Sequence, residues 1–145
     1  MEFKIKSFDK LTASEIYEIL KSRQQIFMLE QKILCLDADG VDYKSVHFFI
    51  EDNNEVIAYL RAFYDSENKD ILHIGRVLTL RHGNGYGREL MKKSLSEIKK
   101  SFNCKKICMH SQKHAAGFYE KFGFKITSDE FLEEGIVHVM MEMDV

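Results

Sequence analysis

The pattern of apolar and polar residues at the start of the chain predicts a strand and then a capped helix. Residues 3–8 alternate apolar side chains with lysines, which is the period of a half-buried strand. Thr12 and Glu15 have the spacing of a capping box, which opens a helix. Apolar side chains then recur at helical spacing as far as Phe27, and we expect the helix to end near residues 28–31.

The next apolar runs predict three strands. Residues 46–51 and 56–64 are rich in β-branched and aromatic side chains, and Asn53-Asn54 lies between them. Asparagine tolerates the backbone of a tight turn, so the two runs should form a hairpin. Residues 71–80 carry a third strand pattern, which leads directly into a glycine-rich stretch.

The second half of the chain alternates helix and strand patterns. Residues 86–100 keep apolar side chains on one helical face, and residues 105–110 have a strand pattern. Residues 113–122 again have helical spacing and precede Gly123, a residue type that commonly ends helices. Residues 136–143 carry the last strand pattern. This order of elements predicts a mixed sheet with helices packed against it, not a regular βαβ series.

Length and charge narrow the class of protein. The 145 residues fit one domain, residues 1–145, large enough to bury a core. Lys and Arg number 21 and Asp and Glu number 23, and a net charge of -2 does not favour nucleic-acid binding. No apolar run reaches the ~20 residues of a membrane helix, and the N-terminus lacks the apolar core of a signal peptide. We therefore expect a cytoplasmic protein with no membrane partner.

The stretch RHGNGYGR, residues 81–88, places three of the eight glycines within five positions, directly before a predicted helix. It is not a Rossmann turn, because Arg88 stands where the third glycine belongs, and the Walker pattern is absent too. The free N–H groups and the dipole of a helix N-terminus favour an anion there. Arg81 and Arg88 flank the turn as pairing groups for phosphate. From these residues alone, a phosphate cradle and a plain strand-to-helix turn both stay open.

A second motif, GFYEKFGF at residues 117–124, resembles a motif of a known family. Together with HGNGYG at residues 82–87, it resembles the GNAT superfamily of acyl-CoA-dependent N-acetyltransferases. His82 departs from that family, which usually has Gln or Arg at this position. A narrower resemblance to the ElaA-like branch covers most of the chain, although Val137 replaces the usual Pro. It is carried by RQQIFMLEQ, LDADG, His47, IGRVLTL, SQKHAAGFYEKFGF and FLEEGIVHVMM.

The resemblance implies an α/β (α+β) GNAT-like fold, with a mixed, mostly antiparallel central sheet and helices on both faces. It also implies an N-acetyltransferase that moves an acetyl group from acetyl-CoA to a primary amine by direct attack in a ternary complex, without a metal. The alternative is a non-catalytic module of the same fold that senses coenzyme A or another nucleotide. The acceptor stays open among a polyamine, an aminoglycoside, a peptide terminus and a lysine side chain. A homodimer is compatible with the family.

The resemblance further implies which residues hold the donor. The main chain of residues 76–80 would pair with the pantetheine arm and polarise the thioester carbonyl, and the loop at residues 82–88 would hold the pyrophosphate. Tyr119 is the expected general acid, because a phenol of pKa about 10 can protonate a thiolate whose thiol has a pKa of ~8.5. The expected donor-binding residues are Val77, Leu78, Thr79, His82, Gly83, Asn84, Gly85, Tyr86, Gly87, Arg88, Gln112 and Phe118.

No pattern in the sequence identifies the general base. An amine of pKa ~10.4 is only about 0.04% neutral at pH 7, so a group must accept its proton, directly or through water. The candidates are Glu30, Asp39, His47, His73, His110 and Glu133.

Two further clusters of polar residues have ordinary interpretations. Asp37, Asp39 and Asp42 are expected to form a solvated turn, although their charge would also attract a cationic acceptor. Four residues have the types of zinc ligands but not a standard zinc spacing, namely Cys104, Cys108, His110 and His114. With three cysteines and no Cys-His-Asp arrangement, neither a disulfide framework nor a cysteine nucleophile is expected.

Overall fold

The computed structural model describes residues 1–145 and contains one eight-stranded sheet. The strand order is β1-β2-β3-β4-β5-β8-β6, and β7 pairs with β8. All pairs are antiparallel except β4 and β5, which run parallel. The strands are β1 (Glu2–Ser7), β2 (Val46–Asp52), β3 (Glu55–Tyr64), β4 (Ile71–Thr79), β5 (Lys106–Gln112), β6 (Lys125–Ile126), β7 (Phe131–Glu133) and β8 (Ile136–Asp144).

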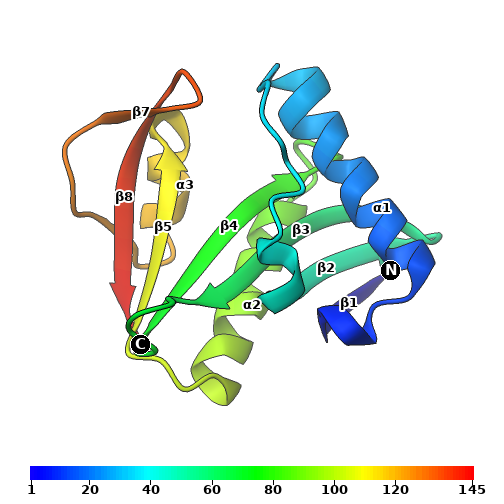
Figure 1. Ribbon diagram of the computed structural model, residues 1–145, viewed down its shortest axis with the longest axis horizontal. Coiled ribbons are helices and arrows are strands. Elements are labelled where there is room, and N and C mark those ends of the chain that lie inside the picture. Colours follow the sequence, from blue (N-terminus) through cyan, green and yellow to red (C-terminus); the bar gives the residue numbers. More distant parts are fainter.

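Helices cover both faces of the sheet. In Figure 1, α1 crosses in front of the strands, whereas α2 and α3 lie behind them. The larger apolar core packs under α2 and α3, and a smaller one packs under α1. The predicted mixed, mostly antiparallel α+β fold is therefore confirmed. No helix combines the length and the apolar composition needed to cross a membrane. The helical segments are α1 (Ala13–Arg23), α2 (Tyr86–Ser101), α3 (Ala116–Glu120), the π-helical η2 (Gln24–Glu30) and the 3-10 turns η1 (Phe8–Lys10), η3 (Val41–Lys44) and η4 (Lys113–Ala115).

The start of α1 follows its sequence signal. The Glu15 N–H donates to Thr12 Oγ1 at 3.1 Å, and the Thr12 N–H donates to Glu15 Oε1 at 2.8 Å. Lys4 and Lys6 of β1 also pair with the Glu15 carboxylate, which is 4% exposed. The Glu15 carboxylate therefore both caps α1 and fastens this helix to β1 at the edge of the sheet. The continuation of this helix as the π-helical η2 was not predicted, because its apolar spacing resembles that of an α-helix.

The β2–β3 hairpin also forms as predicted. Asn53 and Asn54 have φ angles of 50° and 65°, both in the left-handed region. Positive φ at both central residues matches the right-handed twist of the two strands that the turn connects.

The last third of the chain differs from the prediction in two respects. The helix predicted over residues 113–122 is divided into the 3-10 turn η4 and the five-residue α3. Gly123, at φ 105°, follows this region and occupies the left-handed conformation expected where a helix ends. Strands β6 and β7 were missed, because two or three residues are too few for alternation to be visible.

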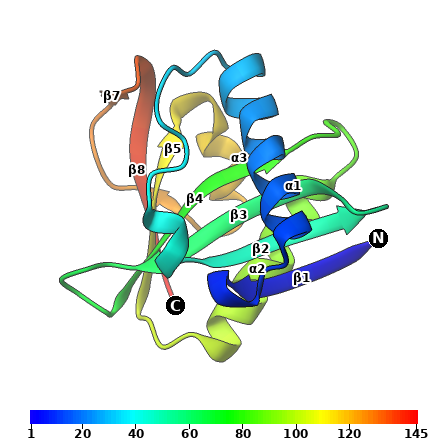
Figure 2. The same cartoon turned by 45° about the vertical axis from the view of Figure 1, so that its right-hand side comes forward.

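Strand β4 contains a bulge and then separates from β5. Opposite Leu60 of β3, β4 has two residues, Arg76 and Val77, and Arg76 adopts φ 55°. The ladder between β4 and β5 ends at the pair His73 and Cys108. Beyond that pair the two strands diverge, as both Figure 1 and Figure 2 show. The position of the site follows from this divergence.

The acidic segment before β2 is not the solvated turn that the sequence predicted. Its three aspartates form ion pairs with arginines of α1, β3 and β4, and two of these arginines, Arg23 and Arg61, are only 1% and 4% exposed. Two of the arginine charges are therefore buried, whereas Asp39 stays exposed, and the ion pairs fasten the loop over β3 and over the bulge. The pairs are Arg23–Asp37, Arg23–Asp42, Arg61–Asp39, Arg61–Asp42, Arg76–Asp37 and Arg76–Asp39.

Candidate active site

A cavity of about 210 Å³ lies where β4 and β5 separate. One wall is formed by the bulge of β4 at residues 75–77, and the opposite wall by residues 109–112 of β5. Because the β4–β5 ladder has already ended, the two walls are not joined by sheet hydrogen bonds. An extended ligand can therefore pair with their main-chain groups, as an added strand would.

Tyr119 lines this cavity from α3. Its ring is 7% exposed and is held edge-on by Phe118 and Phe124, at centroid distances of 5.1 and 6.2 Å. The hydroxyl has no hydrogen-bond partner in the protein, and burial raises the pKa of the phenol above its ordinary value. Tyr119 is therefore a protonated donor in the wall of the cavity between the diverging strands.

The glycine-rich loop lies between β4 and α2. Gly83 and Gly85 have φ angles of 81° and 77°, and Gly85 is the N-cap of α2. The N–H groups of residues 82–85 donate to no acceptor in the protein, and those of the first turn of α2 have no partner within the helix. The Asn84 side chain donates to the carbonyls of Arg81 and His82 and so keeps the loop compact. The loop therefore presents a series of free N–H groups at a helix N-terminus.

Gly87 allows α2 to pack closely against β4. A Cβ at this position would approach Thr79 Cγ2 to 3.3 Å and Phe118 Cζ to 3.7 Å. Leu78 is 4% exposed and belongs to the core under α1, whereas Val77 borders the cavity. Of the donor-binding residues expected from the sequence, the β4 and loop residues thus form one continuous path from the cavity to α2.

The two arginines of the stretch have different surroundings. Arg81 pairs with Asp52 at 2.6 Å and with Glu55 at 3.5 Å, so its guanidinium binds the β2–β3 hairpin rather than the turn. Arg88 borders two surface grooves together with Lys92; Gly85 lines one of them and Lys121 the other. The basic surface therefore continues outward from the loop along α2, which favours an anion that is longer than one phosphate.

His82 and Gln112 already have partners in the protein. The His82 ring is 58% exposed and lies 3.0 Å from Glu30 Oε1, away from the cavity. The Gln112 amide donates to Gln31 Oε1 at 2.8 Å and accepts from His114 Nε2 at 2.7 Å. Gln112 thus connects β5 to the end of η2 beside the cavity.

The structure separates the six candidate bases. Only His110 and Glu133 line the cavity. Glu30 pairs with His82, Asp39 pairs with Arg61, and both ring nitrogens of the buried His47 have partners. His73 pairs with Asp65 outside the cavity.

Two other cavity residues were not among the candidate bases or donor-binding residues predicted from the sequence. His138 reaches it from β8, and Asp37 from the ion-pair network. The motif FLEEGIVHVMM contained His138 and Glu133, but the pairing of β7 with β8 that brings them together could not be seen in it.

The cysteines do not form a site. All three are free, and burial raises the pKa of the Cys108 thiol to about 11. Cys35 is the only one that borders the cavity. No group of three or more His, Cys, Asp or Glu side chains is arranged to hold a metal ion.

In this structure the fourth strand is bulged and separates from the fifth, and a glycine-rich loop connects the fourth strand to a helix N-terminus. This arrangement is typical of acyl-CoA-dependent transferases. Residues 14–145 match the family model described as acetyltransferase (GNAT) domain. The chain belongs to this family and, within it, to the ElaA-like branch.

Individual relatives agree with this assignment. The chain is 36% identical to a UPF0039 protein of Schizosaccharomyces pombe, over 100% of this chain and 98% of the relative. It is 30% identical to the protein ElaA of Escherichia coli, over 94% of this chain and 92% of ElaA. An acyl-CoA N-acyltransferase from Pseudomonas aeruginosa has a similar structure, with a TM-score of 0.91, 26% identity and 99% coverage of both chains. An aminoglycoside 6'-N-acetyltransferase, solved with coenzyme A, shares the fold at a TM-score of 0.74 and 14% identity, covering 97% of this chain and 96% of that chain.

Proposed function

We propose that this protein is an N-acetyltransferase that moves an acetyl group from acetyl-CoA to a primary amine by direct attack. The observation that carries the proposal is the continuity of the site. Free N–H groups of residues 82–85 lead along β4 to a cavity lined by Tyr119, whose hydroxyl has no partner in the protein. The fold and the family support acyl transfer in general; acetyl-CoA as the donor and an amine as the acceptor are the specific proposal.

The donor would bind along β4 and the loop. The N–H groups of residues 82–88 would hold the pyrophosphate, and the basic grooves beside Arg88 would take the outer phosphate of the nucleotide. The pantetheine arm would pair with the main chain of the bulge, which the ending of the β4–β5 ladder leaves accessible. A main-chain N–H of the bulge would stabilise the charge that develops on the thioester oxygen.

Tyr119 would protonate the departing thiolate. Its phenol is protonated at physiological pH because burial raises its pKa, and its hydroxyl has no competing partner. Since acceptor and donor react directly, no covalent acyl-enzyme is needed, and no cysteine or serine has to act as a nucleophile.

Binding and turnover test the proposal separately. We expect acetyl-CoA and coenzyme A, but not NAD, to raise the melting temperature, because only a ligand that binds the folded state stabilises it. We further expect thiol release from acetyl-CoA with at least one of spermidine, kanamycin, a peptide with a free N-terminus and a blocked peptide containing lysine. No shift with coenzyme A would refute the donor assignment. Binding without turnover of any amine would indicate a coenzyme sensor instead.

We expect the substitution Gly85→Val to weaken coenzyme A binding at least tenfold. An added Cβ at residue 85 has no protein atom within 4 Å, so its clash would be with the bound diphosphate. The left-handed φ of 77° will also cost stability, roughly 1–2 kcal/mol. The matched control is Gly40→Val, which has a φ of 83°, the same open surroundings and a position away from the loop. Isothermal titration should show reduced affinity in Gly85→Val alone; equal affinity in both folded variants would refute the cradle.

A further inference from the structure

The cavity is lined by a hydrogen-bonded pair of side chains, His110 and Glu133. We propose that His110 is the general base that deprotonates the acceptor amine and that Glu133 is the residue that positions His110. The inference rests on the proposed function and goes further, because it assigns the proton acceptor that the sequence left open.

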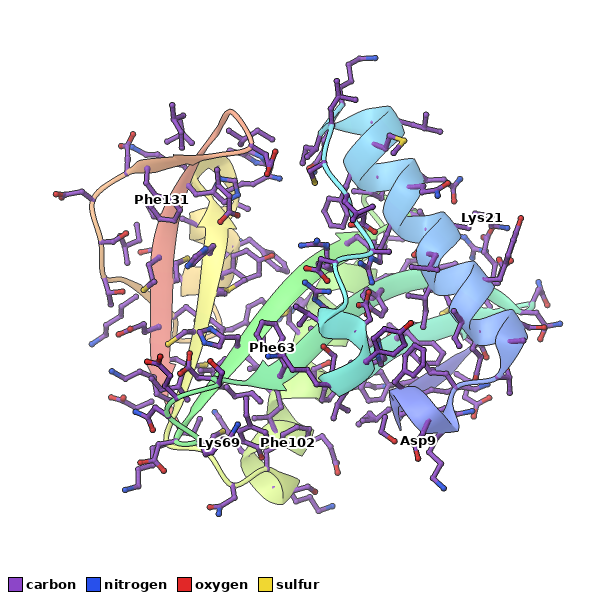
Figure 3. All side chains as sticks on the ribbon, in the orientation of Figure 1. Asp9, Lys21, Phe63, Lys69, Phe102 and Phe131 are labelled. Atoms are coloured by element: carbon purple, nitrogen blue, oxygen red, sulfur yellow. The ribbon has the colours of Figure 1, made fainter.

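The pair has a defined geometry. His110 Nδ1 lies 2.9 Å from Glu133 Oε1, with His110 on β5 and Glu133 on β7. Phe131 packs edge-on against the His110 ring at a centroid distance of 5.3 Å and limits its rotation. Figure 3 labels Phe131 on the side of the molecule that carries β8 and β5. The ring therefore has both a hydrogen-bond partner and a packing partner that fix its orientation.

The hydrogen bond also selects the useful tautomer. Because the Glu133 carboxylate accepts the proton on Nδ1, the neutral ring carries its lone pair on Nε2. Nε2 has no hydrogen-bond partner in the protein, and both residues line the cavity that contains Tyr119. A carboxylate that orients an imidazole in this way makes its other nitrogen the proton acceptor.

The neighbours of Glu133 agree with this role. His138 of β8 donates through Nδ1 to the Ile136 carbonyl, and its Nε2 lies 3.5 Å from Glu133 Oε2. Glu133 therefore lies between two imidazoles, and only His110 has a free ring nitrogen and is substantially exposed, at 45%. Other titratable or charged groups that line the same cavity are Glu134, His114, Tyr119, Asp37, Cys35 and Arg76.

The proton balance needs no further reactant. An ammonium, R–NH3+, gives one proton to His110 Nε2, and the nitrogen lone pair then forms a C–N bond with the thioester carbon. The C–S bond breaks with its electron pair on sulfur, and Tyr119 protonates that sulfur. The second proton leaving the nitrogen restores Tyr119, and His110 passes its proton to solvent, which its exposure allows. The products are R–NH–CO–CH3, coenzyme A and one H+.

If His110 had a purely structural role, its removal would lower stability and not specifically kcat/KM. Ion pairs as exposed as this one, at 45% for each side chain, contribute little to stability. We therefore expect His110→Ala to fold normally and yet to lose kcat/KM at least tenfold at pH 7, with unchanged affinity for coenzyme A. The matched control is His73→Ala, which removes another histidine–carboxylate pair, at 2.8 Å, that does not line the cavity.

Chemical rescue and pH provide the decisive readouts, measured with the amine of the panel that gives the fastest thiol release. Imidazole added to the buffer should restore part of the rate of His110→Ala, because the vacated position is open to solvent. The deficit should also shrink between pH 7 and pH 9 as the neutral fraction of the amine rises, which for an amine of pKa ~10.4 is from about 0.04% to about 4%. Glu133→Ala should lower kcat/KM more than Glu133→Gln, since the glutamine oxygen can still accept from Nδ1.

The outcomes separate this inference from the function on which it rests. If the wild-type protein transfers acetyl to no amine, the proposed function fails. If the wild-type protein is active but His110→Ala retains its kcat/KM at pH 7, or shows a deficit that neither imidazole nor high pH reduces, the base assignment is wrong and the function stands.

Discussion

Replacing Tyr119 with Phe is expected to lower kcat about 10²-fold while the affinity for acetyl-CoA stays unchanged. The substitution removes a single oxygen atom. The ring keeps its edge-on contacts with Phe118 and Phe124, so the wall of the cavity should keep its shape. Single-turnover measurements of thiol release, with binding measured by calorimetry, check both halves of the expectation.

The size of this effect follows from where the hydroxyl lies. Burial raises the pKa of the phenol, so Tyr119 is protonated when the thiolate forms, and the hydroxyl has no other partner to satisfy. Without it, the thiolate must leave as an anion in a cavity whose main-chain donors serve the carbonyl oxygen instead. Coenzyme affinity should not change, because the residues of the phosphate loop do not line the cavity that Tyr119 lines.

Tyr64→Phe provides the comparison for Tyr119→Phe. Tyr64 Oη accepts a hydrogen bond from the Asn103 N–H at 3.1 Å, in a region that does not line the cavity. Its loss should lower stability by about 1 kcal/mol and leave kcat unchanged. Equal values of kcat for the wild-type protein and Tyr119→Phe would exclude Tyr119 as the acid.

The parts of the fold that the sequence predicted are those with local causes. The capping box of Thr12 and Glu15, and the turn at Asn53 and Asn54, form because neighbouring residues supply the hydrogen bonds or tolerate the backbone angles. The glycine-rich loop is local in the same sense, since Gly85 caps the helix that follows it.

The parts of the fold that the sequence did not predict depend on contacts between residues that are distant in the chain. Arg76 adopts a left-handed backbone that its residue type does not favour, and it is held there by Asp37, which lies 39 residues earlier in the chain. The aspartates looked like loop formers because Arg23 and Arg61, which bury their charge, lie on other elements. The sequence named Tyr119 but not His138, which lines the same cavity from β8, because the pairing of β5 and β7 with β8 is not visible in the sequence.

Of the substitutions considered, removing one aspartate charge from the ion pairs around Arg23 and Arg61 should lower stability most. We expect Asp42→Asn to lower the free energy of unfolding by about 3 kcal/mol at pH 7. Asp42 Oδ1 accepts from Arg23 Nη1 at 2.7 Å and from Arg61 Nη1 at 3.0 Å, so its loss leaves two buried guanidinium groups short of negative charge. Urea denaturation, with the slope m unchanged, measures the difference.

The same carboxylates make stability depend on pH in a defined direction. Burial opposes ionisation of Asp42, but the hydrogen bonds and charges of Arg23 and Arg61 outweigh it and lower its pKa below the ordinary 3.8. Hydrogen bonds from Arg61 lower the pKa of Asp39 in the same way. A pKa lowered in the folded state stabilises the protein above the ordinary value and loses that contribution as the pH falls below it. Stability should therefore decrease on acidification below about pH 4, and less steeply in Asp42→Asn.

The substitution Asp52→Asn tests whether the loss of stability in Asp42→Asn comes from the burial of its arginine partners or from the loss of a charge alone. Asp52 also pairs with an arginine, Arg81, at 2.6 Å, but the two side chains are 24% and 37% exposed. Water compensates such a pair when it is broken, so the cost should stay below about 1 kcal/mol. If Asp42→Asn and Asp52→Asn destabilised the protein equally, the buried arginines would not account for the effect, and Asp42 would behave as part of the solvated turn that the sequence first suggested.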